Sequence, residues 1–283
     1  MKRFSIISGS VFALVAIAAL VAVQPAVAQV KASDVVAGSL LTELKKRGNI
    51  KIGFSTFVPW AMRDLKGDII GFEIDVAKKL AKDSGWTVEH VAMSWDGLIP
   101  SVVSGKIDAI IGGMSANVKR SQTVAFSNPY EQGGGNLVAS KAIAGGRSTM
   151  EEFNNPETIF AQRRGTTGVT NVQRFFPKAT IIQFDDENTQ YQELLSGRAH
   201  TVWSSAMIGT WKVEDWPDEL YIPVPGQKLA PWDAGIAIAM GDQVFLNYLN
   251  NWVRENNING YLKERYSYWF EGRPWKNLIP KQG

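Results

Sequence analysis

Cysteine is absent from the 283 residues, and histidine occurs only twice, as His90 and His200. The absence of cysteine excludes thiolate metal sites, disulfide bonds, cysteine nucleophiles and a lipid attached through an N-terminal cysteine. The two histidines are 110 positions apart (200 − 90) on predicted strands, where packing explains them better than metal binding does. The segments GQKLAP and QGGGN lack the spacing of a phosphate-binding loop. We therefore expect no metal, no cofactor and no nucleotide site.

An excess of charge of one sign is also missing, since 30 Lys and Arg residues stand against 27 Asp and Glu residues, a net charge of +3. So small an excess does not indicate a surface that neutralises many phosphates, and we expect no nucleic-acid partner. The composition, 45% hydrophobic and 20% charged, is that of an ordinary globular protein. A chain of this length is near the limit for a single core, which favours two lobes of roughly 100 to 150 residues each.

The N-terminus carries the features of a secretory signal peptide. Lys2 and Arg3 precede an apolar stretch over residues 11–23, and the small-residue triplet Ala26-Val27-Ala28 follows. The apolar stretch is shorter than the roughly 20 residues that span a bilayer, and no later segment is long enough. An uncleaved anchor is the alternative, although no charged stop follows the stretch. We predict a signal peptide over 1–28, cleavage after Ala28, and an exported, periplasmic product.

Apolar spacing in the first half predicts strands that alternate with helices. Residues 50–54 and 107–113 have the continuous apolar pattern of buried strands, and residues 87–93 alternate as a strand. Residues 71–86 have apolar side chains at helical spacing, and Asp96 can cap a helix that begins at Gly97. The order β-α-β-α-β predicts a parallel sheet with helices on its faces.

The second half repeats this theme. Residues 157–168 are predicted to be a strand that enters a glycine-bearing turn, followed by a helix that Pro177 stops and a strand over 179–184. Residues 98–111 and 192–203 share a helix end, Ser-Gly, a basic residue and a buried strand. This similarity indicates two equivalent units, although a common helix-end pattern would also produce it. The aromatic residues of the C-terminal tail are predicted to pack on the first lobe.

Two segments are candidates for places where the chain crosses between lobes. One contains three consecutive glycines, Gly133 to Gly135, followed by an extended apolar stretch. The other covers residues 229–240, in which Pro231 and Gly235 interrupt before a strand. With these crossings, we predict a discontinuous first lobe over 29–137 and 234–283 and a second lobe over 138–233.

Four motifs, GFEIDVAKKLAKDSGW, SWDGLIPSVVSGKIDAIIGGMSANVKR, VAFSNPY and GTTG, together resemble the polar amino acid-binding branch of the periplasmic solute-binding proteins of ABC transporters. The match runs from about Ile50 to Trp203 and more weakly beyond. The resemblance implies an α/β fold of two Rossmann-like lobes joined by two crossing hinge strands, the type II periplasmic binding protein fold, which closes on a ligand held in the cleft.

The resemblance also implies a set of residues that bind the ligand α-carboxylate. Arg120 would pair with it through two parallel hydrogen bonds, which Lys119 could not give. Ser115 would supply a hydroxyl, Gly113 its backbone, and Thr166 and Thr167 of the second lobe would reach the same carboxylate at a helix start. The alternatives are a surface salt bridge for Arg120 and ordinary helix capping for the threonines.

Aromatic residues of the first lobe form the next part of the implied site. Phe57 and Trp95 occupy family positions whose rings sandwich the ligand side chain, and Trp60 lies close to Phe57 in sequence. Flat rings stack on aliphatic, aromatic or cationic groups, so they favour a ligand without specifying it. Core packing is the alternative for all three side chains.

The sequence departs from the family pattern where relatives place an Asp for the ligand ammonium. Ser205 stands at that position, so either another acid substitutes or the ligand lacks a free α-amino group. Asp233 is the preferred substitute, ahead of Asp185, Asp186 and Glu187, although it can also be a turn residue. Phe54 stands where relatives that take basic amino acids have an acid, which makes a lysine or arginine ligand less favoured.

The sequence therefore predicts the binding component of an ABC importer, which captures a small carboxylated solute by cleft closure and presents it to an inner-membrane permease. The expected solute is a neutral or aromatic amino acid or derivative, and not a strongly basic one. We expect a monomer that carries out no chemical reaction. The resemblance leaves two alternatives open. One is an exported enzyme similar to cyclohexadienyl dehydratases, which eliminate water from prephenate or arogenate and need an acid in the cleft. The other is a ligand sensor for a membrane receptor.

Overall fold

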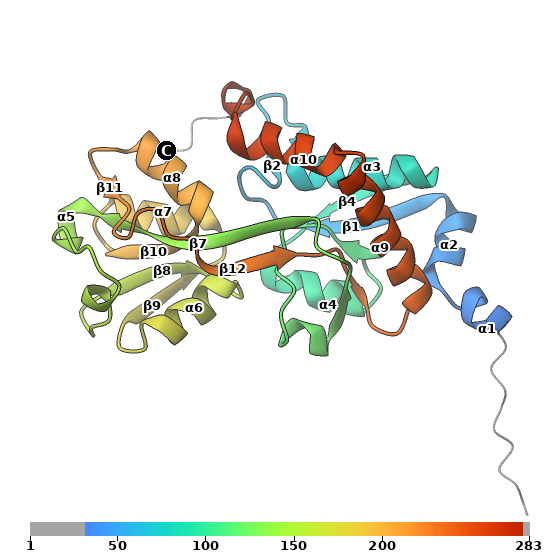
Figure 1. Cartoon of the computed structure of the whole chain (residues 1–283), viewed down its shortest axis with the longest axis horizontal. Coiled ribbons are helices and arrows are strands. Elements are labelled where there is room, and N and C mark those ends of the chain that lie inside the picture. Colours follow the sequence, from blue (N-terminus) through green and yellow to red (C-terminus); the bar gives the residue numbers. More distant parts are fainter. Residues whose placement is uncertain (1–31, 280–283) are drawn as a thin grey trace, which may run out of the picture.

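The structure, a computed structural model, describes residues 32–279 (Figure 1). The predicted signal peptide and its cleavage site lie outside these residues. The chain first builds helices and strands of one lobe: α1 Ala32–Ala37, α2 Leu40–Arg47, β1 Asn49–Phe54, β2 Met62–Arg63, β3 Ile69–Ile70, α3 Phe72–Ser84, β4 Thr87–Ala92, α4 Leu98–Val103, β5 Ala109–Ile110 and β6 Val124–Phe126.

A second set of elements follows, and the chain then returns to the first lobe. The second set comprises β7 Glu131–Ser140, α5 Lys141–Ala144, β8 Ile159–Arg163, α6 Thr167–Phe175, β9 Thr180–Phe184, α7 Glu187–Leu195, β10 Thr201–Ser205, α8 Ala206–Asp215, β11 Leu220–Tyr221 and β12 Leu229–Ala234. The last elements are β13 Ala237–Ala239, α9 Gln243–Ile258 and α10 Tyr261–Tyr266.

The strands form two mixed sheets with equivalent parallel centres. The first sheet has the order β4-β1-β5-β13-β6, and the second has β11-β7-β10-β8-β9 with β12 paired to β7. In the first sheet β1 runs parallel to β4 and β5, and in the second β8 runs parallel to β9 and β10. The predicted α/β fold of two lobes is confirmed. The two similar segments of the sequence become α4 with β5 and α7 with β10, which occupy equivalent places beside β1 and β8.

Both predicted crossing segments are strands that pair with each other. β7 and β12 run antiparallel and side by side between the two halves of the molecule, with Ala234 opposite Glu131 and Trp232 opposite Gly133 (Figure 1). β7 follows β6 of the first sheet, and β12 leads into β13 of the same sheet. The chain therefore enters and leaves the second lobe along one two-stranded ladder. The exact lobe boundaries at 137/138 and 233/234 stay a prediction.

Helix α3 is formed and buried as its apolar spacing predicts. Its N-terminal side chain Phe72 and its residues Val76 and Leu80 are fully buried against β1, and each such side chain contributes roughly 1.5–3 kcal/mol by leaving water. The helix ends at Gly85, whose φ of 72° is a left-handed conformation that favours glycine. The following strand β4 thereby starts in register with β1 and extends the sheet toward its edge.

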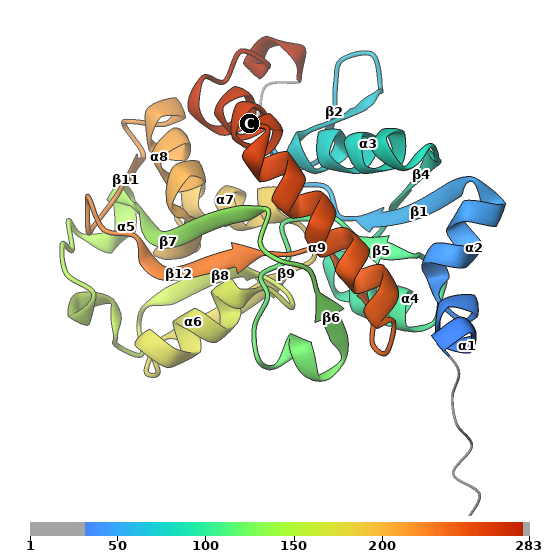
Figure 2. The same cartoon turned by 45° about the vertical axis from the view of Figure 1, so that its right-hand side comes forward.

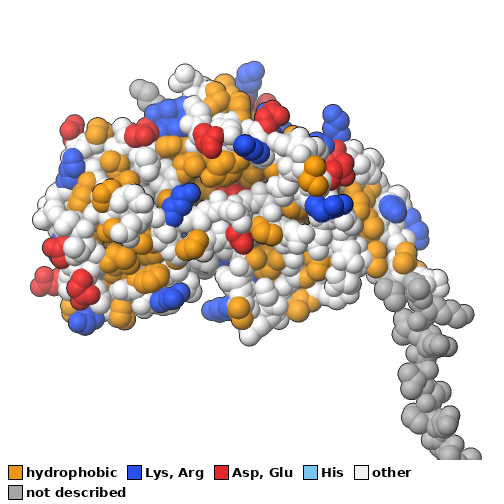
Figure 3. Space-filling view, in the orientation of Figure 1, with side chains coloured by type: hydrophobic (Ala, Val, Ile, Leu, Met, Phe, Trp, Pro, Cys, Tyr) orange, Lys and Arg blue, Asp and Glu red, His pale blue; other side chains and the backbone are white. Residues whose placement is uncertain are grey.

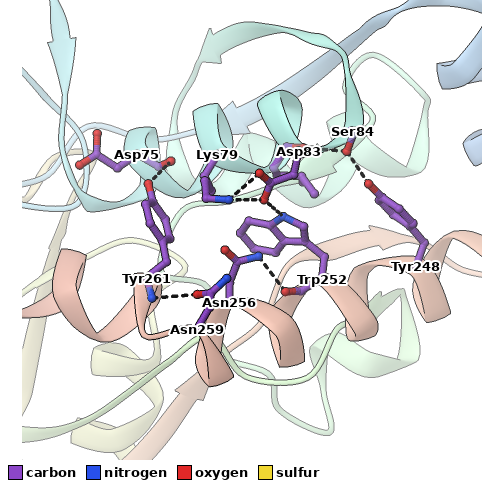
Figure 4. Close-up of polar contacts among 10 residues, drawn as sticks. Asp75, Lys79, Asp83, Ser84, Tyr248, Trp252, Asn256, Asn259 and Tyr261 are labelled. Carbon is purple, nitrogen blue, oxygen red and sulfur yellow. Dashed lines mark hydrogen bonds and ion pairs between the residues drawn. The ribbon is translucent and has the colours of Figure 1, made fainter.

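Helix α9 and the C-terminal tail cover this lobe (Figure 2). Figure 4 shows how α9 is fixed to α3: the indole N–H of Trp252 donates to Asp83 at 2.9 Å, and Tyr248 and Ser84 share a hydrogen bond. In the tail, Phe270 and Trp275 are 2% exposed, and the Phe270 ring lies 4.8 Å from that of Trp60. The prediction that the tail packs on the first lobe is confirmed.

Two local predictions were wrong. The strand predicted over 107–113 forms a ladder only at Ala109–Ile110, because the following glycines turn the chain, with Gly113 at a φ of 64°. Asp96 does not cap α4, since it lies inside a 3₁₀ turn over Trp95–Gly97 and Gly97 precedes the helix. Both differences occur at the end of the sheet that faces the second lobe.

Charged side chains of both signs are interspersed over the face shown in Figure 3, and the lower edge of that face is notched between the lobes. Among the residues that the structure describes, no helix has the length and hydrophobicity needed to cross a membrane.

Candidate functional site

A cavity lies between the two lobes, at the ends of strands from both sheets. Side chains and backbone from the loops after β1 and β5 line it on one side, and the ends of β8 and β10 line it on the other, the edge where α/β sheets place ligands. Its lining residues are Phe57, Trp60, Trp95, Gly113, Ser115, Gln162, Arg163, Thr166, Thr167, Gly168, Glu187, Gln190, Trp203, Ser204, Ser205 and Trp232. Eight of the ten residues proposed from the sequence are in this lining, and Arg120 and Asp233 are not.

The aromatic wall of the first lobe differs from the predicted sandwich. Phe57 stacks on Trp60 with ring centroids 4.5 Å apart and an interplanar angle of 18°. Trp95 meets Phe57 edge to face, at 6.1 Å and 87°. Two perpendicular rings cannot hold a flat group between parallel faces, so Phe57 and Trp95 form two walls of a corner. Trp60 is only 3% exposed, so it also serves the core, as the alternative interpretation proposed.

Arg120 lies at the rim of the cavity and connects the lobes. Its guanidinium donates to the carbonyl of Ser115 at 2.9 Å and to the carbonyl of Gly165 in the second lobe at 3.3 Å. It also lies 5.6 Å from the Trp95 ring, and burial lowers the pKa of Arg120 to about 10. Arg120 forms no ion pair with any residue in the described range, so the alternative of a surface salt bridge does not apply. It lines an adjoining cavity together with Thr166 and Thr167.

The GTTG turn joins the end of β8 to the start of α6. Gly165 has a φ of 71°, which permits the tight turn, and its carbonyl also accepts from the Trp95 indole N–H at 3.1 Å. Thr166 precedes the first helical residue but makes no side-chain cap, since its hydroxyl donates to the Arg163 carbonyl at 2.8 Å. The backbone N–H groups in the first turn of α6 therefore start beside the cavity, in the position that favours an anion.

Arg163, which the sequence analysis did not select, is the buried cation of the cavity. It is the last residue of β8, it is 5% exposed, and its guanidinium lies 5.5 Å from the Phe57 ring and 5.2 Å from the Trp95 ring. It donates to the hydroxyl of Ser55 in the first lobe, and its Nε has no hydrogen-bond partner. Burial lowers its pKa, although Glu187, Asp186 and Asp96 oppose this shift.

Glu187, which sequence reasoning ranked below Asp233, is the acid that the structure brings into the cavity. It is the first residue of α7, after the N-cap Asp186, and it is partly buried. Desolvation raises the pKa of Glu187, and the positive charges of Arg163 and Lys212 lower it in part. Asp233 is instead exposed on β12, with its carbonyl accepting from the Ala116 N–H at 2.9 Å. Ser205 lines the cavity as expected, one residue before α8.

Two buried carboxyl groups, those of Glu73 and Glu131, belong to a hydrogen-bond network that fixes residues of the cavity lining. The Trp60 indole N–H donates to Glu131 at 2.8 Å, and the Tyr130 hydroxyl donates to Glu73 at 2.8 Å while it accepts from the Gly113 N–H at 3.2 Å. Desolvation raises the pKa of Glu131 to about 8 and that of Glu73 well above its usual value, with repulsion from Glu131 adding to the latter shift. Two cavity residues, Trp60 and Gly113, are thus held by polar groups at the start of β7.

The chemistry of the site is that of polar and aromatic recognition. No group of three or more His, Asp or Glu residues that could hold a metal ion occurs within residues 32–279. Among the residues that sequence reasoning missed, Arg163 carried a usable signal, because it follows a predicted strand directly before GTTG and strand ends in such sheets point to ligands. Gln162, Gln190, Trp203, Ser204 and Trp232 had no comparable local signal.

The chain is similar to known proteins over most of its length. The family model of bacterial extracellular solute-binding proteins, family 3, matches residues 50–272. The L-cystine-binding protein TcyJ of Escherichia coli (strain K12) is 25% identical over 82% of this chain and 86% of its own length. The cyclohexadienyl dehydratase of Pseudomonas aeruginosa is 25% identical over 83% of this chain and 87% of its own.

A solved structure of an ancestral amino acid-binding protein, a precursor of cyclohexadienyl dehydratase, is 32% identical and covers 82% of this chain and all of its own, with a TM-score of 0.75. The region that the family model matches, residues 50–272, includes the strands of both sheets, both crossing strands and every residue of the cavity lining. The chain belongs to the bacterial extracellular solute-binding proteins, family 3.

Proposed function

We propose that this protein is the periplasmic binding component of an ABC importer and captures a small carboxylated amino acid or derivative between its lobes. The observation that carries the proposal is one cavity lined from both sheets by charged, hydroxyl and aromatic side chains. The L-cystine-binding and ancestral amino acid-binding relatives support an amino acid as the ligand class. In this proposal the protein is an exported monomer that delivers its ligand to an inner-membrane permease. It leaves the ligand chemically unchanged.

In the proposed complex the ligand α-carboxylate replaces the Gly165 carbonyl as the partner of Arg120. Ser115 and the backbone of Gly113 contact the same carboxylate from the first lobe. Thr166 and Thr167 contact it from the second lobe. Because these groups belong to different lobes, the ligand makes all its contacts only when the lobes are closed, so binding and closure are coupled.

The test is calorimetric titration of the protein and of Arg120→Ala with the tightest ligand from a thermal-shift screen of the standard amino acids and L-cystine. Micromolar binding corresponds to about 8 kcal/mol, and removal of a buried charge partner costs about 2–5 kcal/mol, so the variant should lose nearly all affinity. Lys119→Ala is the matched control, since Lys119 is exposed next to Arg120 and should bind as the wild type does. Unchanged affinity in Arg120→Ala would refute the assignment of Arg120.

A second candidate function, a dehydratase, is favoured by one residue of the cavity, Glu187. A carboxyl with a raised pKa in a cleft can hold a proton at neutral pH and deliver it, as a general acid must. In such a reaction Glu187 would protonate the departing hydroxyl of prephenate, which loses water and carbon dioxide to give phenylpyruvate. The Pseudomonas aeruginosa relative supports this candidate. Incubation with prephenate and measurement of phenylpyruvate absorbance distinguishes the two functions, because a binding protein gives no turnover.

A further inference from the structure

The cavity contains a buried guanidinium that forms no ion pair with the described residues, although the carboxylates of Glu187, Asp186 and Asp96 act on it from beyond ion-pair distance. Arg163 is 5% exposed, yet it has no ion pair with any carboxylate of the described chain within 4 Å. Its guanidinium donates to the neutral hydroxyl of Ser55, and its buried Nε has no hydrogen-bond partner. A buried charge without an ion-pair partner is costly, so the missing anion is expected to come from outside the protein.

Arg163 lines the main cavity, whereas Arg120 lines only the adjoining one. Arg120 and the first turn of α6 lie at the rim and share the adjoining cavity with Thr166 and Thr167. Arg163 does not line that adjoining cavity, and its guanidinium lies against the Phe57 and Trp95 rings inside the main one. A ligand held by its head group at Arg120 therefore extends its other end toward Arg163.

The same contacts work against a cationic ligand. A guanidinium already lies by the two aromatic rings that would otherwise attract a positive group, and a second cation there would meet like charge in a desolvated site. An anion bound at Arg163 would gain a charge-assisted hydrogen bond from its guanidinium.

We propose that Arg163 binds a second acidic group of the ligand, so that the ligand is a dicarboxylic amino acid or a derivative with two acidic groups. This inference rests on the proposed binding function and specifies its ligand class. Arg163 is then the residue that determines specificity at the distal end of the ligand, and ligands with a positive distal group are excluded.

The test compares ligands of nearly the same shape that differ in distal charge. L-Glutamate is titrated against L-glutamine, L-aspartate against L-asparagine, and L-lysine serves as the cationic probe. The wild type should prefer the acid of each pair by about ten- to hundredfold, since a lost partner leaves the buried guanidinium unpaired. L-Lysine should not bind, and the tightest ligand of the amino acid and L-cystine screen should carry two carboxylates.

Arg163→Gln should remove this preference and leave each acid and its amide with similar affinity. Arg164→Gln is the matched control, because Arg164 is the neighbouring exposed arginine, paired with Asp185 at 3.2 Å outside the cavity lining.

A preference that survives in Arg163→Gln, or a wild type whose tightest ligand has one carboxylate, overturns the inference while the binding function stands. No binding to any member of the screen overturns both. The wild-type comparison decides the question even if Arg163→Gln does not fold.

Discussion

At the scale of single residues, the charges in the cavity set what the ligand must carry. Glu187 is the one acid in the lining, and it lies close enough to Arg163 for each to shift the pKa of the other. If the ligand ammonium lies beside Glu187, this carboxylate takes the role of the Asp that binds the ammonium in relatives and that Ser205 replaces here. The prediction is that Glu187→Gln weakens binding of an L-amino acid by about 2–5 kcal/mol and has little effect on the 2-hydroxy acid of the same side chain.

Asp233→Asn is the control, since Asp233 is exposed and outside the lining. Calorimetry on both variants decides between the two acids, and a larger loss in Asp233→Asn would reject Glu187 as the ammonium partner. The pH dependence follows from the raised pKa of Glu187. The ammonium binds the ionised carboxylate, so affinity should rise as the pH rises through that pKa and then level off. In Glu187→Gln this dependence should disappear.

Residues inside the recognised motifs could be placed from the sequence because each motif ends a strand or begins a helix at the same edge of its sheet. Trp95, Ser115 and Thr167 reached the cavity for this reason. Asp233 did not, because side chains alternate along a strand and the neighbouring Trp232 is the one that lines the cavity. That alternation could have been applied to the sequence only with the pairing of β12 known. Whether each residue binds the ligand stays a prediction.

At the scale of elements, the glycines of β7 make room for tryptophans from its neighbouring strands. A Cβ on Gly133 would lie 2.4 Å from the ring of Trp232 on β12, and one on Gly135 would lie 2.4 Å from Nε1 of Trp203 on β10. The two glycines are separated by one residue and so share a face of the strand. Trp203 and Trp232 line the cavity, so the crossing strand sets where these two walls lie.

Gly135→Ala should therefore weaken both stability and binding. The added methyl group displaces Trp203, and overpacking of this kind costs about 1–3 kcal/mol, with a fall in Tm of about 2–4 °C for each kcal/mol. Gly272→Ala is the control, because the nearest atom to its Cβ would be 3.5 Å away and its φ is −96°. Thermal melts with and without ligand measure both effects. A Gly135→Ala protein with wild-type Tm and affinity would show that Trp203 adjusts without cost.

The helices and central strands of each lobe were predictable because their apolar spacing is local. The predicted helix over residues 71–86 is formed within one or two residues of its expected ends. The extent of the strand over 107–113 could not be predicted in this way, because its apolar residues stay buried by packing after the ladder has ended at Ile110. Burial without ladder pairing cannot be distinguished from a strand by hydrophobicity alone.

At the scale of the whole molecule, the C-terminal tail forms a contact between the two lobes. Arg273 of the tail pairs with Asp215 of α8 at 3.0 Å and with Glu214 at 3.2 Å, and Lys276 pairs with Asp215 at 2.5 Å. The Arg273 guanidinium also lies 4.8 Å from the Trp211 ring of α8. The tail otherwise packs on the first lobe, where the Trp269 indole N–H donates to Asp75 of α3 at 2.7 Å. These ion pairs therefore stabilise the arrangement of the two lobes in this structure directly.

A further cavity is lined by Trp211 and Trp275 beside this contact, and Glu187 lines both this cavity and the ligand cavity. Glu187 therefore connects the contact made by the tail with the ligand site.

We predict that Asp215→Ala, which removes the partner of both Arg273 and Lys276, shifts the lobes toward an open state by about 1 kcal/mol, roughly a fivefold change in population. Solution scattering should show a larger radius of gyration, and ligand affinity should fall because less protein is closed. Asp218→Ala, exposed near the same helix, is the control and should scatter as the wild type does. Superimposable scattering from Asp215→Ala and the wild type would mean that the crossing strands and the groups around Arg120 hold the lobes together without the tail.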